Sequence, residues 1–113
     1  MNNIIKRIWH QNGMVAIEDL RGIAFRTEEK AHTFEISGED ADGNTIAFSD
    51  TVSATFLRAD HTDVTITGSV SGGVASVTLT ANCYTVQGPF LLTMFLTSSG
   101  QKTAIYAASG NVD

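Results

Sequence analysis

The second half of the chain alternates apolar and polar residues with a period of two. Val52, Ala54 and Phe56 alternate with serine and threonine, and the same alternation returns over residues 64–67 and 74–79. Successive side chains of a β-strand point to opposite faces, so this period predicts strands with one buried and one wet face. The core residues that it predicts are Val52, Phe56, Val64, Ile66, Val77, Leu79, Phe90, Leu92, Met94 and Ile105.

Turn-forming residues separate these predicted strands. Asp-Gly-Asn at residues 42–44, an acidic loop at residues 60–63, Ser-Gly-Gly at residues 71–73 and Ser-Gly at residues 99–100 each interrupt the alternation. Glycine, asparagine and aspartate supply the positive φ angles that tight hairpin turns require. About seven to nine short antiparallel strands result, with a turn roughly every 8–12 residues, which is typical of an all-β sandwich or barrel.

A single helical turn is expected only at residues 79–84 in this half of the chain. Within it, Cys83 is predicted to behave as a small buried hydrophobe. Tyr84 is predicted to lie at the edge of the core with its hydroxyl bonded to the backbone.

The first twelve residues differ from the rest and read as an N-terminal docking arm. Ile4, Ile5, Ile8 and Trp9 fit one side of a helix, but they also fit a strand with Ile4 and Ile8 on one face and Ile5 and Trp9 on the other. A stretch this short does not separate the two interpretations. Trp9 either fills the core of its own domain or anchors the arm on a partner, since tryptophan is favoured at interface anchors.

Length and charge exclude several classes of protein. A chain of 113 residues forms one domain with a single core. A net charge of −5, with seven scattered basic residues, argues against nucleic acid as a partner. One cysteine permits no intrachain disulfide, which fits folding in a reducing cytoplasm. We also find neither a signal-peptide pattern nor an apolar run near the ~20 residues of a membrane span.

No metal site is predicted. His10, His32 and His61 lie in different predicted elements, and none has a second ligand at metal-binding spacing. The acidic residues at 39–42 and 60–63 could hold a cation in principle, but they lack the full pattern of a calcium loop. Solvated hairpin turns explain both stretches better.

Catalytic and cofactor motifs are not found either. Cys83 has no histidine near it in sequence, and there is no Gly-x-Ser-x-Gly elbow. Ser71-Gly72-Gly73 lies between two predicted strands, not in the strand-loop-helix context of a phosphate loop. We therefore predict no enzyme and no cofactor. A carbohydrate- or cell-surface-binding module stays open as an alternative function, because aromatic and Asn/Asp loop residues can build such a site.

The second half also resembles the N-terminal β-sandwich of the phage baseplate upper protein family and related phage head-fibre or decoration proteins. The resemblance covers residues 33–112, and its motifs are turns and alternation instead of catalytic residues. It is carried by Val52-x-Ala54-x-Phe56-Leu57-Arg58-x-Asp60, Val64, Gly72-Gly73-Val74, Val77-x-Leu79, Gly88-x-Phe90-x-Leu92-x-Met94 and Gly100-Gln101-Lys102-Thr103-Ala104. The opening residues 3–12 are similar to the start of short structural proteins of gut-bacterial prophages.

This resemblance implies an immunoglobulin-like β-sandwich at residues 13–113, preceded by the arm at residues 1–12. It implies a structural virion protein, made in the host cytoplasm, that anchors a fibre or receptor-binding component to the baseplate or capsid. The implied partners are other proteins of the baseplate, tail or capsid and further copies of the chain. Family members usually continue into a helical or fibrous segment, whereas this sequence ends at Asp113.

The most apolar predicted strand, residues 90–96, suggests how the arm is used. Its second face carries Leu91 and Phe95, although a sandwich strand should have one solvated face. We therefore expect the arm and the Leu91/Phe95 face to form one contact surface, within one chain or between chains. Its predicted residues are Ile4, Ile5, Ile8, Trp9, Leu91 and Phe95.

Overall fold

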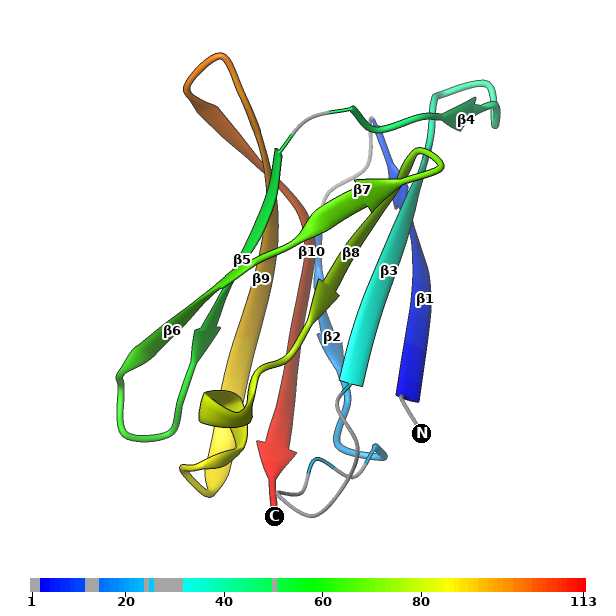
Figure 1. Ribbon diagram of the computed structural model, residues 1–113. Coiled ribbons are helices and arrows are strands. Elements are labelled where there is room, and N and C mark those ends of the chain that lie inside the picture. The colour runs from blue at the N-terminus through cyan, green and yellow to red at the C-terminus, as the bar shows by residue number, and fades with distance from the viewer. Residues whose placement is uncertain (1–2, 12–14, 24, 26–31, 50) are drawn as a thin grey trace.

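Two five-stranded β-sheets pack face to face in the computed structural model, which describes residues 3–11, 15–23, 25, 32–49 and 51–113 (Figure 1). The first sheet, sheet A, runs in the order β1 (Asn3–His10), β3 (His32–Glu39), β8 (Val74–Thr78) and β7 (Ser69–Ser71), and β4 (Thr45–Ile46) pairs with the end of β3. The second, sheet B, runs in the order β2 (Ile17–Asp19), β10 (Gln101–Val112), β9 (Gly88–Ser98), β5 (Thr51–Leu57) and β6 (Asp63–Thr67). The predicted all-β sandwich is confirmed.

Strand number and direction differ in part from the expectation. The described part of the chain contains ten strands, and two pairings are parallel, β1 with β3 and β2 with β10. The alternation of apolar residues shows which face of a strand is buried, but it is the same whether the neighbouring strand runs parallel or antiparallel. The sequence pattern therefore predicted the layers and not these two directions.

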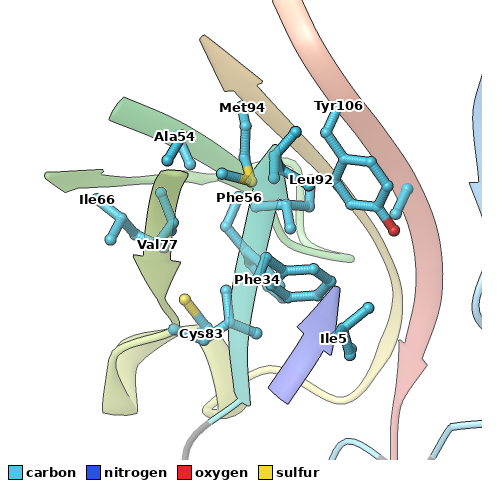
Figure 2. Close-up of a cluster of buried hydrophobic side chains, with 14 of the residues drawn as sticks. Ile5, Phe34, Ala54, Phe56, Ile66, Val77, Cys83, Leu92, Met94 and Tyr106 are labelled. Atoms are coloured by element: carbon cyan, nitrogen blue, oxygen red, sulfur yellow. The ribbon is translucent and has the colours of Figure 1, made fainter. Parts of the chain in front are cut away.

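The core lies between the two sheets and is built from the inward face of every long strand (Figure 2). Phe34 from β3, Phe56 from β5 and Leu92 from β9 are fully buried at its centre. All predicted core residues are buried except Val64, which is only partly buried. Val64 lies on β6, the edge strand of sheet B, where a neighbouring strand covers it from one side only.

The hairpin turns have the backbone angles that their sequences predict. Gly72 and Gly73 join β7 to β8 with φ of 59° and 80°, and Ser99 and Gly100 join β9 to β10 with φ of 51° and 80°. Two successive positive φ angles define the mirror-image turn that suits the twist of a hairpin. The Asp-Gly-Asn turn is closed by the carboxylate of Asp40, whose Oδ1 accepts the amide N–H of Asp42 and of Asn44, both at 2.9 Å.

The predicted helical turn is confirmed as a 3-10 turn, η1 (Ala81–Tyr84). Cys83 is fully buried, and this burial raises the pKa of its thiol. The hydroxyl oxygen of Tyr84 accepts the backbone N–H of His32 at 3.1 Å and lies 2.8 Å from Nδ1 of the same histidine. This contact fastens η1, which precedes sheet B's strand β9, to the first residue of β3 in sheet A.

The N-terminal stretch is a strand and not a helix. Over residues 3–10 it forms β1, paired in parallel with all of β3. Between β1 and β3 the chain forms the short strand β2, and Phe25 makes an isolated bridge to Val112. Residues 1–2, 12–14, 24, 26–31 and 50 lie outside the described residues.

Candidate functional site

The edge strand β1 divides its apolar residues between two faces. Ile4 and Ile8 point to the outer face of sheet A, where each is 53% exposed. Ile5 points inward, where it is buried and pairs in register with Phe34. β1 therefore supplies a residue to the core and at the same time leaves a pair of isoleucines in contact with solvent.

Trp9 packs on the core of its own chain. It is partly buried against the core, and its ring lies 5.9 Å from that of Phe48, centroid to centroid, at an angle of 43°. Of the two interpretations of Trp9 drawn from the sequence, this geometry matches the core-filling one. Trp9 and Ile5 together hold β1 against the sandwich.

A partly buried network of hydrogen bonds links β1 of sheet A to β2 and β10 of sheet B. The guanidinium Nε of Arg7 donates to both carboxylate oxygens of Glu18, at 2.8 and 3.0 Å. The hydroxyl of Tyr106 donates to the same carboxylate. Charge-assisted hydrogen bonds of this kind are stronger than neutral ones, so the network ties the edge strand of sheet A to the edge strand of sheet B.

The hydrogen bonds of this network shift the pKa of each of its three side chains. The hydrogen bond from Arg7 lowers the pKa of the Glu18 carboxyl, and the bond from Tyr106 adds to that effect. The hydrogen bond to Glu18 raises the pKa of the Arg7 guanidinium. Burial raises the pKa of the Tyr106 phenol above its usual 10, and its bond to Glu18 acts in the same direction. The ionised carboxylate is thus the state that the folded protein prefers.

Acid is expected to weaken this link between the sheets. Because the pKa of Glu18 in the folded protein lies below its usual 4.5, the stabilisation is present above about pH 4.5 and is lost as the pH falls through the folded value. With side chains 38% and 33% exposed, the Arg7–Glu18 pair should contribute only about 0.2–1 kcal/mol. Urea unfolding at pH 6 and at pH 3 measures this loss. From pH 6 to pH 3 the free energy of unfolding should fall less in Glu18→Gln than in the wild type. An equal loss in both proteins would contradict it, and Arg7→Gln should reproduce the Glu18→Gln behaviour.

Leu91 and Phe95 lie on the outer face of sheet B. They alternate along β9 with the buried Phe90, Leu92 and Met94, so they point away from the core and are half-buried. The ammonium group of Lys102 lies 5.8 Å from the centroid of the Phe95 ring, within cation–π distance. The neighbouring strand β10 thus covers part of this ring with its own side chain.

The structure does not bring the two predicted halves of the contact surface together within one chain. Ile4, Ile5, Ile8 and Trp9 lie on β1 of sheet A, whereas Leu91 and Phe95 lie on the far face of sheet B. Between these groups stands the whole thickness of the sandwich. A contact between the arm and the Leu91/Phe95 face could therefore form only between chains, and in that form it stays a prediction.

In the acidic turns, aspartate carboxylates accept hydrogen bonds from residues of the same turn. Asp60 Oδ1 accepts the amide N–H of Thr62 at 3.1 Å and also the Thr62 hydroxyl, and these bonds lower the pKa of Asp60. Arg58 Nε donates to the same threonine at 2.8 Å. Among the described residues, no group of three His, Cys, Asp or Glu side chains is placed to hold a metal ion. Nor is any helix in that part of the chain long and apolar enough to cross a membrane.

The Arg7–Glu18–Tyr106 network was missed by reasoning from the sequence. In the sequence, Arg7 is one of seven scattered basic residues. Eighty-eight positions separate Glu18 from Tyr106, and no local pattern signals that these two residues meet. The one available sign is weak: Arg7 shares the inward face of β1 with Ile5 and Trp9, where a charge requires a partner.

These features define an all-β sandwich in which β1 and β2 are the edge strands of the two sheets on one side. No family model matches the chain, and no curated protein matches it significantly in sequence. Among solved structures, the chain is similar to the N-terminal domain of phage TP901-1 ORF48, with a TM-score of 0.50 and 8% identity. The match covers 97% of this chain and 94% of that one, so the likeness extends over the whole fold.

Proposed function

We propose that this chain is a structural protein of a phage virion, a small β-sandwich adaptor that anchors a fibre or receptor-binding component to the baseplate or capsid. The observation that carries this proposal is the fold likeness to a phage protein domain over 97% of this chain and 94% of the other. Near-complete coverage of both chains means that the same unit, not a shared fragment, is compared.

Two features of the described residues support an adaptor. The core is a single cluster that runs from Ile5 to Val112, so the sandwich is held together by its own side chains. Among the described residues, the exposed large apolar side chains lie on strands, at Ile4, Ile8 and Ile17, and the half-buried Leu91 and Phe95 lie on a strand as well. Rigid surfaces built on strands suit stable assembly better than mobile loops do.

Purified particles provide the test. Virions induced from the source host are separated on a density gradient and analysed by quantitative mass spectrometry, and antibody against the protein is located on them by immunogold electron microscopy. We expect the protein at a fixed copy number per particle, with gold at the tail tip or on the capsid. A protein absent from purified particles, or one that binds defined glycans on an array while missing from virions, would replace this proposal with the carbohydrate-binding alternative.

A further inference from the structure

The two lateral sides of the sandwich differ in how their edge strands are protected. On one side, β6 of sheet B continues through Gly68 into β7 of sheet A, so the chain itself crosses between the sheets (Figure 1). These two edge strands are five and three residues long. Short strands with polar residues are the usual protection against pairing with another chain.

On the other side, no strand of the described part of the chain pairs with the outer edge of β1. This strand is eight residues long and ends sheet A (Figure 1). The large apolar side chains that are exposed in the described part of the chain are Ile4, Ile8 and Ile17, and all three lie on β1 or β2 at this side. A long edge strand with exposed apolar residues is a template for pairing with a further strand.

The backbone groups of β1 alternate between its partner and the free edge. The N–H of Gln11 donates to the carbonyl of Glu39 at 2.9 Å, which shows that this position faces β3. Backbone groups of successive strand residues point to opposite sides in the plane of the sheet. Two and four residues earlier the direction is the same, so the odd-numbered positions face β3. Ile4, Lys6 and Ile8 therefore direct their N–H and carbonyl groups to the free edge. The carbonyl of Lys6 already accepts a hydrogen bond from Nη1 of Arg7 at 2.7 Å, and its second lone pair is left for a further donor.

We infer that this edge pairs with the β1 edge of a second copy of the chain, as an antiparallel ladder centred on Lys6. A two-fold axis through that position places Ile4 opposite Ile8 of the second copy and Ile8 opposite Ile4 of the second copy. The same face and the same outward-directed backbone groups then meet on both strands, as a two-fold interface requires. A hollow of about 370 Å³ on the outer face, lined in part by Ile8, Ser37 and Val74, lies beside each pair of isoleucines.

Charge is compatible with this register. Lysine on an edge strand commonly opposes pairing, and the ladder would bring two Lys6 side chains together. Glu35 is the register partner of Lys6 in sheet A, so each copy adds one carboxylate beside the two ammonium groups and the four charges sum to zero. Arg7 points inward and is already paired with Glu18. A second copy is therefore favoured over an unrelated strand, because one sequence supplies both complementary sides.

The dimer should be weak in dilute solution. A single strand ladder with a pair of isoleucine contacts lies at the small end of specific interfaces, below roughly 1,200 Å² of buried surface. Such contacts become effective when many copies are arrayed, because each further contact forms at high effective concentration. This inference rests on the edge of β1 alone, so a monomeric protein would leave the proposed virion role untouched.

Sedimentation equilibrium of the whole chain from about 10 µM to 1 mM tests the inference. We expect the weight-average mass to rise from 12.1 kDa toward twice that value. Lys6→Pro removes an outward N–H and should weaken association at least about 10-fold, whereas Lys6→Thr keeps that N–H and should associate at least as well as the wild type. Ile8→Lys should also weaken it, and the matched control Ile17→Lys, on β2 of sheet B, should not.

Circular dichroism and thermal unfolding show whether each variant is folded, and if Lys6→Pro unfolds, the Ile8→Lys and Ile17→Lys pair decides. A mass of 12.1 kDa at every concentration would overturn the inference. So would a dimer that survives Ile8→Lys, or one that Ile17→Lys disrupts equally, because association would then involve another surface.

Discussion

Replacing Phe56 with alanine is expected to lower the free energy of unfolding by about 3–5 kcal/mol. Phe56 is fully buried on β5, a strand with neighbours on both sides. Its ring stacks on that of Phe90, with centroids 4.6 Å apart and planes inclined by 21°. Truncation removes the buried surface of one ring and leaves a cavity against the other, which the rigid sheet cannot close.

Phe95→Ala is the matched control for this substitution. It removes the same side chain from the adjacent strand β9, but from the half-buried outer face. Denaturant unfolding with a constant slope should therefore give a clearly smaller loss for Phe95→Ala than for Phe56→Ala. Equal losses, or a loss near zero for Phe56→Ala, would contradict the placement of Phe56 at the centre of the core.

The sequence predicted this core well because burial on a strand repeats every second residue. Phe56, Leu92 and Met94 follow that period, and all are fully buried. The tight turns could be predicted equally well, because the need for glycine or asparagine at a positive φ angle is local to the turn. Val64 is the exception, because edge and centre strands show the same alternation although an edge strand has fewer neighbours.

The pairing of strands that are distant in the sequence could not be predicted in the same way. β1 meets β3 across 29 positions of register, from Asn3 with His32 onward, and no residue of either strand shows which neighbour it has. The contact of Arg7 with Glu18 and Tyr106 depends on that pairing and on the pairing of β2 with β10. The network could be recognised only after both strands had been placed.

The placement of the candidate interaction residues on their strands was predicted in part, and their role in an interaction stays a prediction. The sequence correctly marked β9 as apolar on both faces, with Leu91 and Phe95 on the side away from the core. It also found the apolar residues of β1 but could not divide them between faces, because a helix and a strand were both open. The structure shows that Ile5 is buried and that Ile4 and Ile8 are exposed. The proposed pairing at the edge of β1 depends on this division.

Gly68 should be among the positions least tolerant of substitution outside the aromatic core. The chain passes from β6 to β7 at this residue, and its N–H donates to the carbonyl of Val52 at 2.9 Å. A Cβ at Gly68 would lie 2.5 Å from the carbonyl oxygen of Ser76, 2.7 Å from Val77 Cγ2 and 2.8 Å from Val52 Cγ1. The carbonyl belongs to the backbone of β8 and cannot rotate away, so the crossing strand must shift.

Gly68→Ala is accordingly expected to lower the free energy of unfolding by about 1–3 kcal/mol or more, the range for overpacked sites. Gly22→Ala is the matched control, because a Cβ there meets nothing within 4 Å and the residue has no positive φ. Alanine at such a site restricts the unfolded chain and should leave stability unchanged or raise it by about 0.4–1 kcal/mol. Urea unfolding of both variants separates the two effects. If Gly68→Ala were as stable as Gly22→Ala, the close approach of β6–β7 to β8 would be wrong, and with it the closure of this side of the sandwich.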